Sequence, residues 1–339
     1  MKRAIITGGA GFIGSSLTRT LQDLHPKAEL LVVDDLRGGH FSNLVEPRPH
    51  LTSSFQGRFL AQPVGEINWF DILDIWQPDV VFHLASITDT TVHDQPLMMR
   101  DNVEAFEFLL EACRESSTRL VWASSAATYG TDANGAMTER RPFRLEDAGQ
   151  PANVYGFSKW VMENVHRTVR SENPDFHLVG LRYFNVFGPG EGFKGKMASM
   201  ICQLTKQVLQ GQAPRIFYDG SQARDQVSVQ DVVGATIAAS SPDAKPGIYN
   251  VGSGQVTSFN TIVELINQAL GTTHDPEYFE NPYDFYQDYT CADLTETLAG
   301  LPWKPERDPG PAIIEYIKWL GRDTTLMTRD KQAATIEAR

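Results

Sequence analysis

Residues 3–14 read Arg-Ala-Ile-Ile-Thr-Gly-Gly-Ala-Gly-Phe-Ile-Gly, and this stretch decides the fold. The apolar run over residues 3–7 predicts a buried strand, after which Gly8, Gly11 and Gly14 recur every third position and a helical apolar period begins. Glycines let the backbone turn tightly and approach a pyrophosphate, while free N–H groups at a helix N-terminus attract its charge. A glycine-rich turn without a ligand is the alternative, but the order of strand, loop and helix favours dinucleotide binding.

A second strand is predicted over residues 30–33, and it ends in Asp34 and Asp35. These acids stand about twenty residues beyond the last glycine, where a carboxylate accepts hydrogen bonds from the adenosine ribose in dinucleotide-binding folds. Arg37 follows closely, and its guanidinium could pair with a 2′-phosphate. A solvated loop charge is an equally good interpretation of Arg37, so NADP and NAD both remain open as cofactors.

Further strands are predicted over residues 80–85, 120–123 and 178–186, with helical periods between them. This alternation predicts an α/β fold with a Rossmann-type, doubly wound parallel sheet that binds ligands at the carboxyl ends of its strands. His83 is interpreted as a packed residue at a strand end and not as a catalyst. The residues that fall at such strand ends, and that we expect to share one site, are Gly8, Asp34, Ala85, Ser125 and Asn185.

Residues 153–159 read Asn-Val-Tyr-Gly-Phe-Ser-Lys and begin a predicted amphipathic helix. Tyr155 and Lys159 are four positions apart, so a helix places them on one face. A nearby ammonium would lower the phenol pKa from its usual value of ~10 and allow Tyr155 to act as a base. The pattern Tyr-x-x-x-Lys is weak alone, because an ordinary amphipathic helix can carry it.

The alternation of strands and helices ends at a glycine-rich loop, residues 188–196. This change indicates entry into a second, smaller α/β lobe that binds substrate. We expect residues 1–187 to form the dinucleotide-binding domain, with residues 225–252 returning to the main sheet. Residues 188–224 and 253–320 would form the smaller lobe, and residues 321–339 a polar tail.

The composition excludes several classes of protein. A length of 339 residues with 41% apolar content indicates a globular protein, and a net charge of −12 argues against nucleic acid or an anionic membrane as partner. No apolar run approaches the ~18 residues of a membrane span, and glycines interrupt the start too early for a signal peptide. The three cysteines are far apart and the eight histidines show no metal-binding spacing. We therefore expect a cytoplasmic protein without a bound metal.

Several of these motifs together resemble the extended short-chain dehydrogenase/reductase family. The residues that carry this resemblance are Gly8, Gly11, Gly14, Ser125, Tyr155, Lys159 and the run 182–189. Within the family, the chain is most similar to the epimerases that act on ADP-heptose. That similarity rests on residues 123–130, 153–159 and above all 193–199, Phe-Lys-Gly-Lys-Met-Ala-Ser, which general sugar-nucleotide epimerases of the family do not carry.

The resemblance implies Tyr155 and Lys194 as the two catalytic bases, with Ser125 hydrogen-bonded to the reacting oxygen and Lys159 holding the nicotinamide ribose. The spacing alone favours a solvated loop lysine at position 194, so its role depends on the resemblance. The substrate would contact Ser125, Asn185, Lys196, Phe217, Arg224 and Tyr286. The cofactor would contact Gly8, Gly11, Phe12, Ile13, Gly14, Asp34, Asp35, Arg37, Leu84, Ala85, Ser86, Asn102, Tyr155, Lys159, Val186 and Lys194.

The reaction that the resemblance implies is inversion at C6 of the heptose of ADP-D-glycero-D-manno-heptose, which supplies a precursor of the lipopolysaccharide core. The carbon would be oxidised and reduced transiently by bound NADP, with NAD as the alternative cofactor, and the enzyme would be a homo-oligomer. A UDP-hexose 4-epimerase, or another sugar-nucleotide epimerase or oxidoreductase of the family, is the alternative. A dehydratase is disfavoured because Ala126 and Ala127 stand where dehydratases carry Asp and Glu, and a non-catalytic sensor because Tyr155 and Lys159 are both present.

The chain departs from the heptose epimerases at three places. His40 stands where they have a lysine associated with the NADP phosphate, and Gln62-Pro63 replaces a small residue followed by Asp. Gln226 and Ser228 interrupt an aromatic-rich segment. These differences leave the reaction type in place but weaken the expected cofactor preference and the identity of the sugar.

Overall fold

The computed structural model describes residues 1–281 and 286–322. Seven parallel strands form the main sheet in the order β10-β6-β5-β4-β1-β2-β3, which confirms the predicted doubly wound α/β fold. The strands are β1 (Arg3–Thr7), β2 (Glu29–Val33), β3 (Arg58–Leu60), β4 (Val80–His83), β5 (Arg119–Ser125), β6 (Leu178–Tyr183) and β10 (Gly247–Val251).

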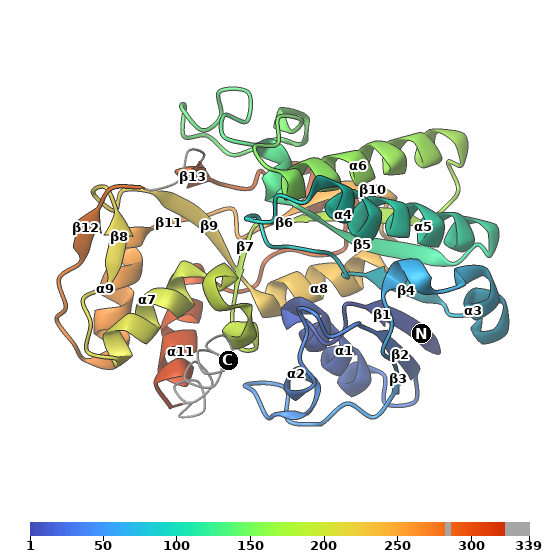
Figure 1. Ribbon diagram of the computed structural model, residues 1–339, viewed down its shortest axis with the longest axis horizontal. Helices are drawn as coiled ribbons and strands as arrows, with labels where there is room; N and C mark the ends of the chain where they lie inside the picture. The colour runs from blue at the N-terminus through green and yellow to red at the C-terminus, as the bar shows by residue number, and fades with distance from the viewer. Residues whose placement is uncertain (282–285, 323–339) are drawn as a thin grey trace.

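Helices cover both faces of this sheet (Figure 1). One layer holds α1 (Phe12–Leu24) and α8 (Val229–Ala239), and the other holds α3 (Trp69–Trp76), α5 (Ala105–Glu115) and α6 (Val154–Glu172). Side chains of a strand alternate between the faces, so Ala4 and Ile6 of β1 join the core under α1 whereas Ile5 joins the core under α5. Because both faces are buried, the main strands are almost wholly apolar.

A smaller lobe lies beside the carboxyl end of the main sheet (Figure 1). Its strands are β7 (Asn185–Phe187), β9 (Ala223–Ser228), β11 (Val256–Ser258) and β13 (Tyr289–Thr290), with the separate pair β8 (Arg215–Phe217) and β12 (Glu277–Phe279). Helices α7 (Met200–Leu209), α9 (Phe259–Leu270) and α11 (Pro309–Arg322) share one apolar core against them. The remaining helices are short: α2 (Ser42–Val45), η1 (Val64–Glu66), α4 (Gln95–Met98), η2 (Met99–Glu104), η3 (Ala126–Tyr129), η4 (Leu145–Asp147), η5 (Glu191–Met197) and α10 (Thr295–Gly300).

The expected return of residues 225–252 to the main sheet is wrong for its first part. Strand β9 pairs with β7, β11 and β13 in the smaller sheet, and only α8 and β10 return to the large one. A physical reason is the buried Asp225 of β9, whose carboxylate must be paired with hydrogen-bond donors. The Asp225 carboxylate accepts hydrogen bonds from backbone N–H groups, including those of Ser253 at 2.7 Å and Ala292 at 2.9 Å.

The single strand expected over residues 178–186 is two strands, β6 and β7, which belong to different sheets. Chain entry into the smaller lobe therefore occurs at Phe184, earlier than expected. No helix among residues 1–281 and 286–322 combines the length and the apolar character that crossing a membrane requires.

Candidate active site

The glycine-rich loop between β1 and α1 closes so tightly that side chains are excluded. Gly8 has φ +68°, and a Cβ atom there would lie 2.6 Å from the backbone nitrogen of Ala85. A Cβ on Gly14 would lie 2.0 Å from the carbonyl oxygen of Gly8. Helix α1 starts directly after Gly11, and no side chain caps its first turn. The loop therefore offers open backbone N–H groups at a helix N-terminus, which fits the pyrophosphate of a dinucleotide.

Asp34 lies where it was predicted, at the end of β2, and it is buried against the glycine loop. Its carboxylate accepts hydrogen bonds from the backbone N–H of Ala10 at 2.9 Å and of Leu36 at 2.8 Å. Burial raises the pKa of this carboxyl, although these backbone donors oppose the shift. Asp34 thus ties the β2 loop to the glycine loop, a structural role in addition to the predicted contact with a ribose.

Arg37 lies in a network of ion pairs on the same rim. Its Nε donates to Asp35 Oδ2 at 2.6 Å and its Nη1 donates to Asp101 Oδ2 at 2.7 Å. Arg37 is thus a half-exposed loop charge that two carboxylates hold in place. The ring of His40 makes a different contact: it stacks on Phe193 with the centroids 4.2 Å apart.

The predicted catalytic helix, α6, begins at the carboxyl edge of the main sheet. The side chain of Asn153 accepts a hydrogen bond from Gly156 N at 2.8 Å, which fixes Tyr155 in the first turn. A Cβ on Gly156 would lie 2.7 Å from the carbonyl oxygen of Ala127, so only glycine allows this turn to approach the end of β5. The Ser125 hydroxyl consequently lies beside the Tyr155 phenol, and its interaction with the phenol acts to lower the phenol pKa.

Lys159 is buried one turn further along α6. Its Nζ donates to Ser86 Oγ at 2.6 Å and to the carbonyl oxygen of Ala123 at 2.8 Å. Burial lowers the pKa of this ammonium to about 7. Burial also raises the pKa of Tyr155, which the interaction with Ser125 only partly opposes. The expected lowering of the phenol pKa by Lys159 is therefore wrong here, because the ammonium is directed to Ser86 and Ala123.

Lys194 lies on η5, in the loop between β7 and α7. Its Nζ is 5.6 Å from the centroid of the Phe12 ring, so the loop reaches across to the start of α1. The loop is held at its base by the buried Glu191, whose carboxylate accepts from Gly188 N at 3.2 Å and from Ser199 Oγ at 2.9 Å. Lys196, the other predicted lysine, donates to Thr91 Oγ1 at 2.9 Å. The two lysines thus connect the smaller lobe to the loops of the main sheet.

The predicted substrate residues of the smaller lobe form an aromatic and cationic cluster. The buried guanidinium of Arg224 lies 4.8 Å from the centroid of the Tyr286 ring, and Tyr286 packs edge-on against Phe217 at 5.3 Å. Among the residues that the structure describes, Arg224 Nη1 finds no hydrogen-bond partner. Asn185 stands one strand away and donates to Thr290 Oγ1 at 2.9 Å. An unpaired buried guanidinium N–H favours an anionic ligand at this position.

The other predicted cofactor residues surround the end of β4. Leu84 N and Ala85 N donate to Thr7, at 3.1 Å and 3.2 Å. Asn102 is buried and its side-chain oxygen accepts from Ile87 N at 2.8 Å, so it fixes the backbone of the loop after β4. Ile13 lies in the first turn of α1, and Val186 lies in β7.

Two residues at this site escaped the sequence interpretation, Asp101 and Glu191. Asp101 directly precedes Asn102, which was predicted to contact the cofactor, and this neighbouring position was the sequence feature that could have indicated Asp101. Nothing in the local pattern, however, pairs Asp101 with Arg37, since 64 positions separate them. Glu191 stands in the motif segment around Lys194, but only the folded loop shows that its carboxylate closes the loop.

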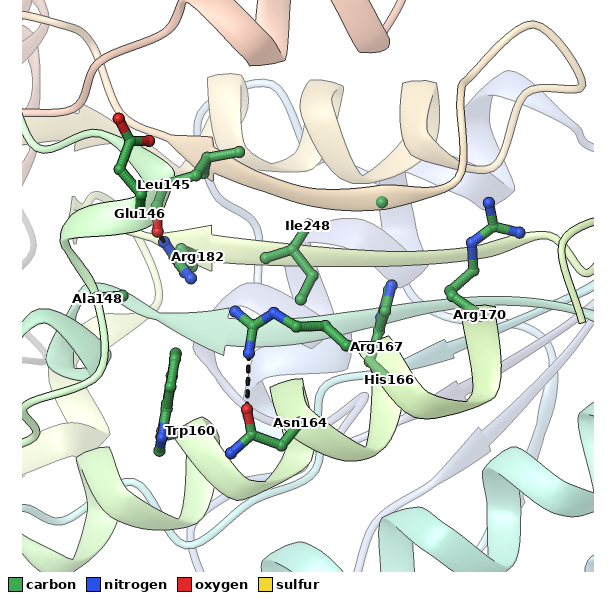
Figure 2. Close-up of a pocket in the computed structure, with 11 residues that line it drawn as sticks. Leu145, Glu146, Ala148, Trp160, Asn164, His166, Arg167, Arg170, Arg182 and Ile248 are labelled. Carbon is green, nitrogen blue, oxygen red and sulfur yellow. Dashed lines mark hydrogen bonds between the residues drawn. The ribbon is translucent and has the colours of Figure 1, made fainter. Parts of the chain in front are cut away.

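A hollow of about 720 Å³ lies away from these residues, between α6 and the edge strand β10 (Figure 2). None of the predicted site residues lines it. Its arginines already have partners: Arg182 pairs with Glu163 at 2.7 Å, and Arg167 donates to Asn164 Oδ1 at 2.8 Å. Arg170 donates to the carbonyl oxygen of Phe176 at 3.1 Å, beyond the end of α6. The polar groups of this groove therefore stabilise the fold, and the candidate site remains at the carboxyl edge of the main sheet.

Residues 1–281 and 286–322 contain no cluster of His, Cys, Asp or Glu side chains that could hold a metal ion. Cys113, Cys202 and Cys291 are all buried, and no disulfide joins any two of them.

Comparisons with known proteins identify the family of the chain. Residues 4–252 match the model of the NAD dependent epimerase/dehydratase family. The chain is similar to the ADP-L-glycero-D-manno-heptose-6-epimerase of Helicobacter pylori, with 35% identity over 94% of this chain and 96% of that one, and a TM-score of 0.82. It is also similar to the UDP-N-acetylglucosamine 4-epimerase of Methanobrevibacter ruminantium, solved with UDP-N-acetylmuramic acid (27% identity, 94% and 97% of the two chains, TM-score 0.80). The NAD complex of the Thermus thermophilus UDP-glucose 4-epimerase is similar too (26%, 95% and 99%, TM-score 0.75).

The family match covers the glycine loop, Ser125, Tyr155, Lys159 and both lysines of η5. It also spans β10, the last strand of the main sheet. The chain therefore belongs to the NAD dependent epimerase/dehydratase family, whose epimerases are isomerases that act on sugar nucleotides.

Proposed function

We propose that the protein inverts C6 of the heptose of ADP-D-glycero-D-manno-heptose, using NADP as a bound cofactor, and so supplies a precursor of the lipopolysaccharide core. The observation that carries the proposal is that a phenol and an ammonium from different lobes both come to the carboxyl end of the main sheet. Tyr155 lies at the end of the main sheet beside Ser125, and Lys194 reaches the glycine loop from the smaller lobe. The similarity to the Helicobacter pylori heptose epimerase supports the choice of sugar.

Inversion of a carbinol carbon explains why two proton-transfer groups are needed. When bound, the nicotinamide cofactor supplies a reversible acceptor for the hydride of that carbon. The hydroxyl oxygen occupies different positions in the two epimers, so a single group cannot reach it in both. In either direction, one of Tyr155 and Lys194 takes the proton from the first epimer and the other returns a proton to the second.

The environment of Tyr155 suits the proton-donating half of this cycle. Burial raises the pKa of the phenol, which keeps it protonated until an oxygen of the substrate arrives. Ser125 holds the phenol from one side and would contact the same substrate oxygen. Lys159, fixed by Ser86 and Ala123, would hold the nicotinamide ribose at the adjacent strand ends.

The ADP part of the substrate would bind in the smaller lobe. Arg224 presents an unpaired, buried N–H group that can donate to a diphosphate oxygen, and charge-assisted bonds of this kind are strong in a dry environment. The rings of Phe217 and Tyr286 provide a surface on which an adenine can pack. Asn185 stands between this cluster and the main-sheet residues.

The experiment is a direct test of substrates. The purified protein is incubated separately with each ADP-heptose epimer, with UDP-glucose and with UDP-N-acetylglucosamine, and the products are followed by proton NMR in D2O. We expect both ADP-heptose epimers to reach one equilibrium mixture without deuterium at C6, because the hydrogen removed is the hydrogen returned. Inversion of a UDP-sugar at C4, with ADP-heptose unchanged, would replace this proposal by the 4-epimerase that two of the similar structures suggest.

A further inference from the structure

Arg37 and Asp101 form a contact between two distant segments at the rim of the cofactor site. Arg37 follows β2, whereas Asp101 lies in η2, and their side chains meet at 2.7 Å. Arg100 also donates to Asp101, through Nε to Oδ1 at 2.8 Å, and Asp35 holds Arg37 through Nε at 2.6 Å. Two arginines and two carboxylates thus form a chain of ion pairs whose formal charge is zero.

The position of this chain matters because of what lies at the end of β2. In a dinucleotide-binding fold the adenosine ribose sits there, and an arginine near it accommodates the 2′-phosphate of NADP. Asp34 fixes the β2 loop to the glycine loop, so Arg37 stands at the expected ribose. A bidentate bond to a 2′-phosphate would need two nitrogens of the guanidinium, and two of its three, Nε and Nη1, are already bound to Asp35 and Asp101.

We propose that Asp101 sets the preference between NADP and NAD by competing with the 2′-phosphate for the guanidinium of Arg37. The inference rests on the proposed cofactor position and deepens it. NADP must displace Asp101 from Arg37 and place a phosphate close to that carboxylate, which repels it. NAD has no such group, so the Arg37–Asp101 pair can persist beside its free 2′-hydroxyl.

The state of Asp101 supports this competition. Partial burial raises its pKa, but the hydrogen bonds from Arg100 and Arg37 outweigh that effect and lower the pKa overall, so the carboxylate is charged at neutral pH. Only 14% of its side chain is exposed, so solvent screens its charge less than that of a free surface acid. Arg100, by contrast, is 63% exposed and can turn away without loss of packing.

The test is a competition between the two cofactors for Asp101→Asn, which keeps the shape of the side chain but removes its charge. Each protein is equilibrated with equal concentrations of NADP and NAD, freed of unbound cofactor and denatured, and the released dinucleotides are counted by mass spectrometry. We expect the NADP-to-NAD ratio to rise about tenfold over wild type. Arg37→Ala combined with Asp101→Asn should abolish that gain, because no guanidinium remains to be released.

Glu277→Gln is the matched control, since it neutralises an acid that pairs with Arg215 at 3.2 Å in the smaller lobe. The NADP-to-NAD ratio released from Glu277→Gln should equal that released from wild type. Asp101→Ser, with thermal unfolding recorded for every variant, repeats the test should Asn fold poorly. An unchanged NADP-to-NAD ratio in both Asp101 variants would overturn this inference but leave the cofactor proposal standing. So would a rise in the ratio that persists when Arg37→Ala is added. A wild-type protein that captures neither dinucleotide would overturn the cofactor proposal as well.

Discussion

The ammonium of Lys159 lies 2.6 Å from the hydroxyl oxygen of Ser86, although 73 positions separate the two residues in the chain. The contact joins helix α6 to the loop after β4, and the second bond of Lys159, to the carbonyl oxygen of Ala123, joins it to β5. Lys159 therefore fixes the catalytic helix across two neighbouring strand ends. It does so at the cost of burying a cation, which has a measurable consequence for stability.

Lys159→Met should change how stability depends on pH. Burial lowers the pKa of Lys159 from its usual 10.5 to about 7, so between these values the unfolded chain binds a proton that the folded one does not. The free energy of unfolding of wild type should therefore rise with pH across this window, relative to the variant. Urea denaturation of dinucleotide-free protein from pH 6 to pH 10 measures the difference.

The exposed Lys27 provides the control for that measurement. The free energy of unfolding of Lys27→Met should change with pH in the same way as that of wild type. If the free energy of unfolding of Lys159→Met also changed with pH as that of wild type does, the buried ammonium would not be the source of the pH dependence.

Gly14→Ala should disrupt the dinucleotide cradle. The added Cβ would lie 2.0 Å from the carbonyl oxygen of Gly8, so the loop must move. We expect a loss of about 1–3 kcal/mol in the free energy of unfolding and the loss of most copurified dinucleotide. Gly38→Ala is the matched substitution, because its Cβ would meet nothing within 4 Å, and its effect should stay within about 0.5 kcal/mol. Equal dinucleotide content in the two variants, measured after denaturation, would show that Gly14 is not part of the cradle.

The features that the sequence predicted correctly are those with a local steric requirement. The glycine loop is one such feature. Close backbone contacts at Gly8 and Gly14 leave no room for a Cβ atom, so the spacing of the glycines predicts the loop. The turn at the start of α6 is another, because Asn153 caps it and Gly156 permits the approach to Ala127. These motifs could be assigned without knowledge of the rest of the chain.

The features that were missed depend on contacts between distant segments. The membership of β9 in the smaller sheet follows from the N–H groups that Asp225 finds near residues 253 and 292. Burial raises the pKa of Tyr155, and the ammonium of Lys159 does not offset this rise because it is directed to Ser86. The spacing of Tyr155 and Lys159 gives their shared helix face but not the direction of the ammonium, which residues elsewhere in the chain decide.

Arg224→Met should separate ligand binding from stability. Arg224 Nη1 is buried without a partner in the described part of the chain, so its removal should cost at most about 2 kcal/mol of stability, the contribution of its contact with the Tyr286 ring. The KM for the sugar nucleotide should rise about 100-fold, because the diphosphate loses its buried cation. Thermal unfolding and initial rates on each variant provide the two measurements.

Arg182→Met is the comparison for this variant. Arg182 is also buried but pairs with Glu163 at 2.7 Å, so its loss should cost about 3–5 kcal/mol by removing the buried cation from that carboxylate, which would keep only Arg167 and Ser124 as side-chain partners among the residues described. If Arg224→Met were as destabilising as Arg182→Met, Arg224 would be a structural arginine and the proposed diphosphate site would be wrong.

Tyr155→Phe and Lys194→Met should each reduce net epimerisation of ADP-heptose at least about 100-fold, because either change leaves one epimer without its proton-transfer group. The losses should not add: the double variant should be little slower than either single one, since the cycle needs both groups in every turnover. Rates are followed by NMR from each epimer, with Lys304→Met, at an exposed position, as the control that should retain full activity.

Lys194 needs one further measurement, because its ammonium lies over the Phe12 ring next to the cofactor cradle. The dinucleotide released from Lys194→Met on denaturation should equal that released from wild type, which would separate proton transfer from cofactor retention. A UDP-hexose 4-epimerase would use Tyr155 alone and tolerate Lys194→Met. An enzyme that keeps its cofactor and most of its activity after Lys194→Met, but loses activity after Tyr155→Phe, would therefore contradict both the two-group mechanism and the assignment of the heptose.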